Sequence, residues 1–515
     1  MKINRKIMIV LGCGLLALAL GLGSALGAEK TLRIGSPWGA KTLDPQKDGF
    51  LWMRLGVLEG LTDVDQELRL RPALAESWSV SADHKVWTFK IRPNVRFHDG
   101  TALTAGVMRD CLKRLRDQGA LLKNVPLESI DAPDDLTLTI ATTTPFAPLP
   151  AYLSKGEAAA LAPSSFNQAG EVVKPVGTGF FKLESWRVKE EIVASANRDH
   201  WSGTAPRVDR VVCRFVPEAM TRSALVRTGE LDIAQILPPD LAKSMVADPS
   251  FKLQSLPIAR CRIIDFNLAR EPFSDIRARR AVNRAINRQD LIEFVLDGFG
   301  EPAKSLFPSV IFWSNSQAPA YEYDPEKAKG LLAEAGWKDE NGDGVREKDG
   351  RPLVVKFITY SNRAELPPLA EVIQNQLSQV GVKAELVVLQ VDAANEMRNK
   401  GDFDLSLVGR GLLFTPDPDE IFMTDYFSEN TFKDGWGAYH YRNEEVDRLI
   451  LAGRAEFDAG KRKEIYDRVQ ELLLEDSPTT NLNYYVNVDV LNTKVKGYQM
   501  HPNEHSFRLE SVELD

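Results

Sequence analysis

Cysteine and histidine are scarce in this sequence. Its 515 residues include four cysteines and six histidines, and only Cys111, Cys213 and Cys261 remain after residue 27. No two of these cysteines have CxxC spacing, and three thiols cannot build a disulfide framework. The histidines include no HExxH pair, so the sequence does not indicate a zinc site of that type. We expect no resident metal or other cofactor, and buried cysteines that act as small apolar side chains, with one disulfide at most.

Signatures of catalysis are also absent. The sequence contains no GxSxG elbow and no SxxK motif of the kind that positions a serine nucleophile. It also lacks the GxxxxGK[ST] loop that cradles nucleotide phosphates. We therefore expect a protein that is not an enzyme. A secreted hydrolase remains the alternative from another functional class, and turnover of a bound peptide would reveal it.

Long apolar runs are absent except near the start of the chain. Lys2, Arg5 and Lys6 precede an uncharged apolar run over residues 7–22, and small residues follow up to Gly27. That order is typical of a cleaved signal peptide, and the run is shorter than the ~20 apolar residues of a membrane span. We predict a signal peptide over residues 1–27 and export to the periplasm. The apolar stretch before Cys13 is too short for lipoprotein cleavage, so we expect no lipid anchor.

Positive charge is in deficit, with 64 lysines and arginines against 72 aspartates and glutamates. The net charge of −8 argues against nucleic acid as a partner, because nucleic acid requires a basic face. The chain is also longer than the ~250–300 residues at which a single hydrophobic core stops growing. We therefore expect two or more domains.

What the sequence does contain is an alternation of short apolar strands and amphipathic helices. The spacing of apolar residues predicts helices over residues 104–118 and 274–296, with Thr104 and Ser274 as N-caps. Residues 352–409 predict strands and helices in βαβ order, which implies a parallel or mixed sheet covered by helices. The sequence therefore indicates an α/β protein.

Two acidic motifs resemble functional sites. Residues 97–100 (FHDG) offer a histidine and an aspartate, but Asp-Gly between a strand and a helix is typical of a turn. Residues 339–344 (DENGDG) resemble the start of a calcium loop, yet the twelfth position holds Gly350 where an EF-hand needs glutamate. We predict a turn at the first motif and a solvated hairpin tip at the second.

Longer motifs resemble a known family. They are residues 71–105 (RPALAESWSVSADHKVWTFKIRPNVRFHDGTALTA), 175–186 (PVGTGFFKLESW), 266–292 (FNLAREPFSDIRARRAVNRAINRQDLI), 323–337 (YDPEKAKGLLAEAGW) and 417–422 (DPDEIF). In this order they resemble the extracellular solute-binding proteins of family 5, the peptide, dipeptide and nickel receptors of ABC importers. The resemblance covers essentially the whole chain after the signal peptide.

The resemblance implies a bilobed periplasmic binding protein fold of type II, with two mixed-sheet lobes and an extra N-terminal subdomain. Lobe I is expected over residues 28–58 and 176–269, with a C-terminal return over 486–515. The extra subdomain is expected over 59–175 and lobe II over 270–485. A protein of this family captures its ligand between the lobes and presents it to membrane permease subunits. We expect such a protein to act as a monomer.

The resemblance also bears on the ligand. Peptide-binding members often place an aspartate three residues before their Asp-Pro dipeptide, where it anchors the peptide amine, and that position holds Phe414. Arg410 lies seven residues before Asp417, a register that resembles the nickel and metallophore branch. An arginine suits a ligand carboxylate through bidentate pairing. The alternative is an ion pair between Arg410 and a nearby acid of the protein.

The nickel branch is matched incompletely. Members with known metal ligation place a histidine after the Asp-Pro, and the comparable position holds Asn430. Their tryptophan and arginine in the N-terminal lobe fall at Leu122 and Gly156. We therefore expect a small anionic solute, first a nickel or other metal chelate whose own ligands hold the metal, with an oligopeptide or dipeptide as the alternative. The predicted ligand-binding residues are Arg410, Phe414, Thr415, Tyr426, Asn430, Trp436, Tyr439, His440 and Trp38.

Overall fold

The structure is a computed structural model that describes residues 29–119, 121–309, 311–315, 317–318, 321–431 and 437–515. The predicted signal peptide over residues 1–27 and the predicted ligand residue Trp436 lie outside the described residues.

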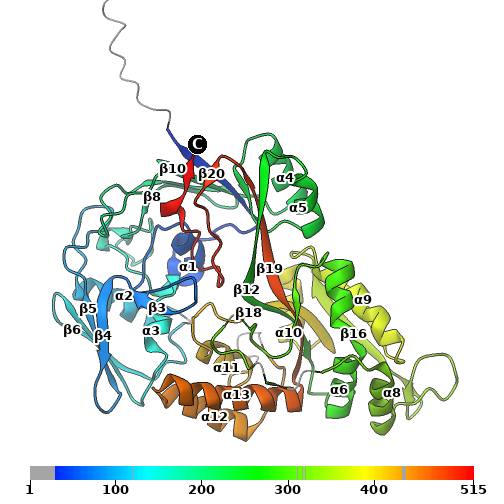
Figure 1. Ribbon diagram of the computed structural model, residues 1–515. Coiled ribbons are helices and arrows are strands. Elements are labelled where there is room, and N and C mark those ends of the chain that lie inside the picture. The colour runs from blue at the N-terminus through cyan, green and yellow to red at the C-terminus, as the bar shows by residue number, and fades with distance from the viewer. Residues whose placement is uncertain (1–28, 120, 310, 316, 319–320, 432–436) are drawn as a thin grey trace, which may run out of the picture.

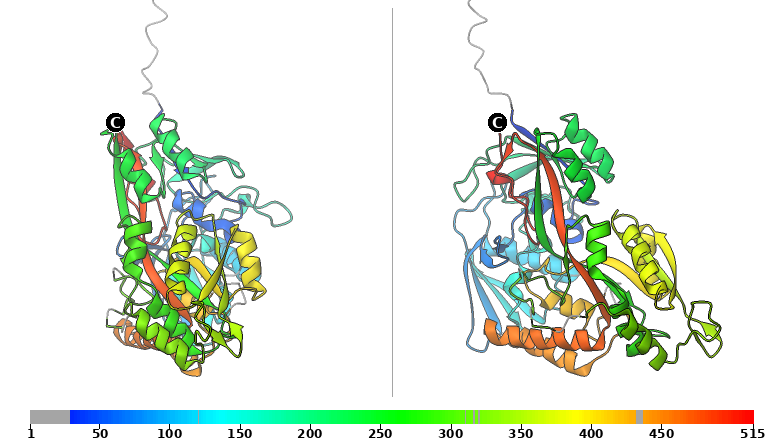
Figure 2. Two further views of the ribbon diagram at one scale, coloured as in Figure 1. Left: turned by 90° about the vertical axis from the view of Figure 1, so that its right-hand side faces the viewer. Right: turned by 45° about the vertical axis from the view of Figure 1, so that its right-hand side comes forward.

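Two long antiparallel strands run through the molecule. They are β12 (Phe251–Phe266) and β19 (Thr479–Asn492), and they lie side by side in every view (Figures 1 and 2). Their pairing shifts register between Pro257 and Cys261. Each strand is longer than an ordinary strand of 5–6 residues. The pair is therefore long enough to extend through both lobes, with one end in lobe I and the other end in lobe II.

Lobe I surrounds the end of the pair that contains Phe251 and Asn492. Its strands are β1 (Thr31–Ser36), β8 (Phe181–Arg187), β9 (Glu191–Ala196), β10 (Arg210–Phe215), β11 (Ile233–Ala234), β20 (Val495–Lys496) and β21 (Glu513–Leu514). Its helices are α1 (Pro45–Arg54), α4 (Ala219–Arg227) and α5 (Pro239–Met245). β1 is parallel to β10 and β11 and antiparallel pairs flank them, so the sheet is mixed. Buried apolar residues near the C-terminus, such as Val512, join the lobe I core.

The extra subdomain has a sheet and a core of its own. Its strands are β2 (Thr62–Val64), β3 (Leu70–Pro72), β4 (Ala75–Val80), β5 (Val86–Ile91), β6 (Leu127–Asp134) and β7 (Thr137–Thr142), and its helices are α2 (Ala105–Gln118) and α3 (Leu149–Tyr152). Four of the strands form an antiparallel sheet in the order β4-β5-β7-β6. The Thr104 hydroxyl accepts a hydrogen bond from Val107 N at 3.2 Å, which confirms the predicted helix start. Gly100 adopts a positive φ in the predicted Asp-Gly turn.

Lobe II surrounds the other end of the long strands. Its strands are β13 (Glu301–Pro302), β14 (Glu347–Lys348), β15 (Arg351–Pro352), β16 (Val354–Tyr360), β17 (Lys383–Leu389) and β18 (Leu405–Gly411). Its helices are α6 (Ile276–Ala285), α7 (Arg288–Asp290), α8 (Pro325–Glu334), α9 (Leu366–Ser378), α10 (Val391–Asn399), α11 (Asp419–Asp425), α12 (Glu444–Ala455) and α13 (Ala459–Asp476). β16 is parallel to both β17 and β18, with α9 and α10 in the connections, which confirms the predicted βαβ order.

One sheet joins the two lobes. Its strand order is β17-β16-β18-β12-β19-β11-β1-β10-β9-β8, and β13 also pairs with β19. In Figure 1 α12 and α13 lie at the bottom of the molecule, below α11, while α8 and α9 lie at the right, on the side of lobe II away from the extra subdomain. None of the described helices is both long enough and apolar enough to cross a membrane.

The long helix predicted over residues 274–296 is wrong in two respects. The N-cap is Asp275, whose side chain accepts a hydrogen bond from Arg277 N, and not Ser274. The helix ends at Ala285, because Asn287 then caps a second helix by accepting hydrogen bonds from two following backbone amides. Asparagine commonly takes this capping role, and that local bond competes with a continuous helix. The remaining cysteines, Cys111, Cys213 and Cys261, are all free.

Candidate ligand site between the lobes

Four arginines meet where the long strands pass from lobe I to lobe II. They are Arg54 at the end of α1, Arg260 and Arg262 on β12, and Arg363 between β16 and α9, and we call them the interlobe arginine cluster. Arg54 belongs to lobe I and Arg363 to lobe II. The cluster is therefore built by both lobes and by the strand that joins them.

Tyr485 on β19 lies at the centre of the cluster. The guanidinium carbons of Arg262, Arg363 and Arg260 lie 3.6, 5.2 and 5.9 Å from the centroid of its ring. The negative face of an aromatic ring attracts a cation within about 6 Å. One ring therefore stabilises three guanidinium groups that would otherwise repel one another.

Two glutamates neutralise part of the cluster. Glu504 Oε2 lies 2.7 Å from Arg260 Nη2, and Glu504 Oε1 lies 3.8 Å from Arg54 Nη2. Burial raises the pKa of the Glu504 carboxyl, but Arg260 and Arg54 outweigh burial and hold that pKa at about 2. Glu365 Oε1 lies 3.4 Å from Arg262 Nη2. Burial likewise opposes the charge of Glu365, yet Arg262 and the neighbouring arginine in the cluster hold its pKa below the ordinary value.

The cluster keeps an excess of positive charge. Four arginines face two glutamates, and arginine does not lose its proton in proteins. Arg260 and Arg262 are only 8% and 4% exposed. Among the described residues, Nε and Nη1 of Arg262 and Nε of Arg260 are buried without a hydrogen-bond partner, and no carboxylate lies within ion-pair distance of Arg363. Because buried charges are normally paired, this arrangement is suited to an anion.

The predicted residues Trp38 and Phe414 lie at this cluster. The Arg363 guanidinium lies 5.1 Å from the centroid of the Trp38 ring, so that a lobe I tryptophan contacts a lobe II arginine. Phe414 is 39% exposed, and its ring centroid lies 5.2 Å from the Arg260 guanidinium. Gly411 permits this position, because a Cβ there would lie 2.3 Å from the Phe414 ring.

The predicted anchor Arg410 lies beside acids of the protein. Its Nη2 and Nε lie 2.6 and 2.8 Å from the two carboxylate oxygens of Asp425, and its side chain is 18% exposed. This is the intramolecular ion pair that the sequence left as the alternative. The predicted residue Thr415 is buried and donates its hydroxyl hydrogen to Glu420. A role for either residue in ligand binding stays a prediction.

The three acids of residues 417–420 all have partners within the protein. Arg462 donates hydrogen bonds to both oxygens of Asp417, one of them at 2.8 Å from Nη2. Asp419 is fully buried, accepts a hydrogen bond from Tyr152 of the extra subdomain at 2.8 Å, and has Arg454 Nε at 2.9 Å. Burial dominates at Asp419 and raises the pKa of its carboxyl to about 6.

The third acid of this stretch also reaches across to the extra subdomain. Lys155 Nζ donates a hydrogen bond to Glu420 Oε1 at 2.8 Å. These carboxylates therefore hold α11 of lobe II against the extra subdomain. Since each acid has a partner within the protein, the stretch is structural and not a catalytic pair.

The other predicted residues are spread over lobe II. Tyr426 is buried in the lobe II core with its hydroxyl 3.3 Å from Thr479 Oγ1. Asn430 donates to Asn124 Oδ1 of the extra subdomain at 3.4 Å. Tyr439 packs against His440, with ring centroids 4.5 Å apart, and against another ring of lobe II. The structure does not bring these residues together with the arginine cluster through any contact of the described residues.

The sequence contains one local signal for the cluster. Arg260 and Arg262 alternate with apolar residues in a strand, and side chains two residues apart on a strand share one face. Two arginines on one face of a buried stretch of strand indicate a charged site. Arg54, Arg363, Tyr485 and Glu504 come from distant parts of the chain, and no local pattern marks them.

A cavity of about 330 Å³ lies in a different place, between β2–β3, the loop after His200 and the C-terminal segment. Its central acid Asp63 lies 3.0 Å from His505 Nε2 and 3.4 Å from Arg508 Nη1. His501 and His505 have HxxxH spacing, but Pro502 separates them and His501 Nε2 bonds to a backbone carbonyl. Asp63 therefore has basic partners within the protein.

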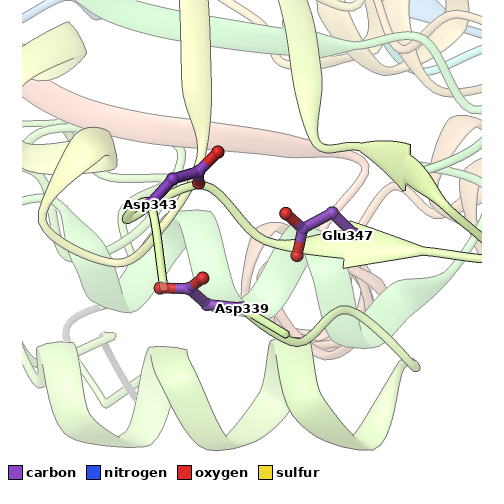
Figure 3. Close-up of side chains that lie close together, drawn as sticks. All are labelled: Asp339, Asp343 and Glu347. Carbon is purple, nitrogen blue, oxygen red and sulfur yellow. The ribbon is translucent and has the colours of Figure 1, made fainter. Parts of the chain in front are cut away.

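The acidic hairpin loop forms the one cluster of three carboxylate, imidazole or thiol side chains within reach of a shared ion in the described part of the chain. Oxygens of Asp339, Asp343 and Glu347 lie within 4.8 Å of one another (Figure 3). The Asn341 amide donates to Glu347 at 2.6 Å and to Asp343 at 3.1 Å. The loop leads into the β14–β15 hairpin, as predicted, and its two aspartates are exposed.

Solved structures of other proteins show which fold the chain adopts. The crystal structure of a nickel ABC transporter from Bacillus halodurans superposes with a TM-score of 0.75, at 25% identity, over 94% of this chain and all of that chain. This structure and other solved structures that superpose on the chain confirm the predicted bilobed type II periplasmic binding fold.

The family follows from the sequence. The profile described as bacterial extracellular solute-binding proteins, family 5, matches residues 69–433, and the chain belongs to this family. The glutathione-binding protein GsiB of Escherichia coli O1:K1 is 26% identical over 96% of this chain and 98% of its own. The oligopeptide-binding protein AppA of Bacillus subtilis is 28% identical over 87% of this chain and 84% of its own. These relatives are binding proteins.

Proposed function

We propose that this protein is the periplasmic receptor of an ABC importer and that it captures a small anionic solute between its lobes. The observation that carries the proposal is the interlobe arginine cluster, where four buried or half-buried arginines face two glutamates. Charge-assisted hydrogen bonds from arginine to a carboxylate are about twice as strong as neutral ones. A ligand anion therefore gains affinity there and neutralises charge that the protein leaves uncompensated.

The position of the cluster supports capture by lobe closure. Trp38 of lobe I contacts Arg363 of lobe II, and Glu504 of lobe I pairs with Arg260 on the connecting strand. A hinge movement about β12 and β19 separates these groups, and a ligand held by both lobes opposes the separation. The closed, loaded protein then presents the solute to two permease subunits and their ATPases. We infer a monomeric receptor without catalytic activity.

A metal chelate is the first candidate ligand. A carboxylate-rich chelate of nickel or another metal supplies its own metal ligands, so that the protein needs to recognise only the negative charge. The solved structure of a nickel transporter among the relatives supports this candidate. The described residues near the cluster offer arginine and aromatic side chains, which suit the outside of a chelate better than a bare metal ion.

A peptide is the second candidate. GsiB and AppA are named for binding glutathione and oligopeptides, and both align with most of this chain. A peptide with a free carboxylate meets the same arginines. Phe414 at the position of the amine anchor distinguishes this site from an ordinary peptide receptor.

Native mass spectrometry of the mature protein, purified without added ligand, tests the proposal when it is combined with metal analysis. A bound organic mass together with nickel or another metal supports the chelate. A ladder of bound peptides contradicts the chelate and supports the second candidate. If no anionic solute co-purifies and neither chelates nor peptides raise the melting temperature, the receptor function is wrong. Cleavage of an added peptide would instead indicate a hydrolase.

A further inference from the structure

We propose that the ligand carries two carboxylate groups, and that the two halves of the interlobe arginine cluster each bind one of them. This inference rests on the proposed function and deepens it, because it fixes the number and spacing of the acidic groups. One half consists of Arg262, Arg363 and Glu365. The other half consists of Arg54, Arg260 and Glu504.

Each half has one positive charge more than its glutamate neutralises. In the first half the single acid, Glu365, lies 3.4 Å from Arg262. In the second half Glu504 is shared by Arg260 at 2.7 Å and Arg54 at 3.8 Å. An uncompensated buried charge costs free energy, because it has lost water and gained no counter-ion. One carboxylate per half completes the pairing.

The residues around the cluster do not change this balance. Burial raises the pKa of the Asp489 carboxyl. The negative charge of Glu504 raises that pKa further, while the positive charge of Arg222 lowers it. Asp489 also accepts hydrogen bonds from Tyr498 at 2.8 Å and from Ile236 N at 2.8 Å, so it is already satisfied. The excess of two positive charges therefore stays with the four arginines.

The strand geometry sets the distance between the two carboxylates. Arg260 and Arg262 are two residues apart on β12, and both guanidinium groups contact the ring of Tyr485. They therefore project from the same face, and a strand rises about 3.3 Å per residue. The two arginines leave the strand about 7 Å apart. A single small ligand can span that distance, since guanidinium groups of both halves lie within 6 Å of the centroid of one ring, Tyr485.

The unpaired donors point to the same two positions. Nε and Nη1 of Arg262 are buried without a partner in the first half, and Nε of Arg260 is buried without a partner in the second half, among the described residues. Both side chains are more than nine-tenths buried. A carboxylate that approaches each arginine gives these donors an acceptor.

A series of α,ω-dicarboxylates measures the spacing directly. The mature protein is titrated by isothermal calorimetry with succinate, glutarate, adipate, pimelate and suberate, and with the monomethyl ester of each. We expect an affinity maximum at adipate or pimelate, whose carboxylates reach about 7 Å apart when the chain is extended. We expect each monoester to bind at least tenfold more weakly than its diacid. Equal affinities for monoesters and diacids overturn the proposal.

Two further probes separate the sources of such a ligand. The dipeptide Ala-Glu has two carboxylates and Ala-Gln has one, while nickel citrate presents carboxylates on a metal complex. A preference of at least tenfold for Ala-Glu over Ala-Gln supports an acidic peptide, and tight binding of nickel citrate supports a chelate. If a neutral or singly charged solute binds more tightly than every dicarboxylate, the inference fails while the receptor function stands. If no probe of any kind binds, the receptor function fails.

Variants assign the carboxylates to the two halves. Arg363→Gln and Arg54→Gln should each weaken binding of the best diacid at least tenfold, and each should reduce the advantage of the diacid over its monoester to less than about threefold. Arg69→Gln is the matched control, since the Arg69 side chain is 71% exposed in the extra subdomain. Circular dichroism confirms folding of every variant. Unchanged diacid affinity in either cluster variant overturns the two-carboxylate assignment.

Discussion

The molecule contains two concentrations of buried charge that differ in one respect. At the start of α11 the carboxylates of Asp417, Asp419 and Glu420 each have a basic partner at 2.9 Å or less. At the interlobe arginine cluster the acids are too few for the bases, and no carboxylate of the described residues lies within ion-pair distance of Arg363, whose guanidinium contacts the rings of Trp38 and Tyr485. In the first region every one of these carboxylates has a basic partner, so we call it the complete region. In the second region the arginines outnumber the glutamates, so we call it the incomplete region.

This difference in charge balance suggests different roles for the two regions. A buried ion pair that is complete holds two elements together, and here it holds α11 against the extra subdomain through Tyr152 and Lys155. A buried charge that is incomplete costs stability unless something else compensates it. Proteins keep such strain mostly at functional sites. Under the proposed function we therefore expect the ligand to bind at the arginines, and variants of both regions test this expectation.

The largest effect is expected when the complete region is broken. Arg462→Leu leaves Asp417 buried without its partner, because Arg462 binds both oxygens of that carboxylate. Removing one member of a buried pair costs about 3–5 kcal/mol. Urea unfolding followed by tryptophan fluorescence should show that loss in the free energy of unfolding. Ligand affinity of the folded variant should stay within about twofold of the wild type.

Lys461→Leu is the matched control for this experiment. It removes a neighbouring exposed cation from the same helix, α13, and replaces it with the same side chain. Its effect should lie within about 0.5 kcal/mol. Equal effects of the two variants would show that the Asp417–Arg462 pair is not a structural contact.

The next effect is a dependence of stability on pH. Burial raises the pKa of Asp419 from 3.8 to about 6, so the folded protein binds a proton there more tightly than the unfolded chain. This group stabilises the fold below pH 4, and its contribution is lost as pH rises to 6. The loss amounts to about 3 kcal/mol at most, at 1.36 kcal/mol per pKa unit.

Asp419→Asn removes the titration. The free energy of unfolding, measured between pH 4 and pH 6.5, should fall less steeply with rising pH in this variant than in the wild type. Asp392→Asn on α10 serves as the control for loss of one exposed carboxylate. A wild-type slope retained in Asp419→Asn would assign the dependence to another group.

A smaller loss of stability is expected in the incomplete region. Arg262→Met replaces a buried arginine with an apolar side chain of similar length, and it removes the ion-pair partner of Glu365. The free energy of unfolding should fall by less than about 3 kcal/mol, because the Glu365 side chain is 24% exposed and keeps Arg363 as a neighbouring positive charge. Affinity for the anionic ligand should fall at least tenfold, or about 1.4 kcal/mol. A variant that is destabilised as strongly as Arg462→Leu and binds ligand normally would reverse the roles of the two regions.

Much of the fold follows from the sequence because it depends on local signals. The cap at Thr104, the βαβ order over 352–409 and the exposed hairpin tip over 339–344 all appear as predicted. The long helix over 274–296 does not, since the capping preference of Asn287 overrides the helical spacing of apolar residues. Family motifs supply the bilobed arrangement, which no local signal contains.

The site follows from the sequence only in part. Of the predicted ligand residues, Trp38 and Phe414 lie at the arginine cluster and Arg410 has Asp425 beside it, and a role in ligand binding stays a prediction for all three. The charge balance around an arginine depends on residues far apart in the chain, such as Glu504, which lies 244 positions from its partner Arg260. Sequence spacing cannot show which arginine has an acid beside it, and the fold can.

The smallest effect is expected at Phe414, the position where the family resemblance implies an aspartate in peptide-binding members. Phe414→Asp places a carboxylate within reach of Arg260, whose guanidinium lies 5.2 Å from the Phe414 ring. The new acid should pair with that arginine and not with a ligand amine, because the cluster already has excess positive charge. Calorimetry with Ala-Glu and N-acetyl-Ala-Glu should therefore show less than about a threefold gain for the free amine, or 0.7 kcal/mol. Phe414→Leu controls for the loss of the ring, and a gain of tenfold or more in Phe414→Asp would mean that this position, and not the arginine cluster, governs how a peptide terminus is recognised.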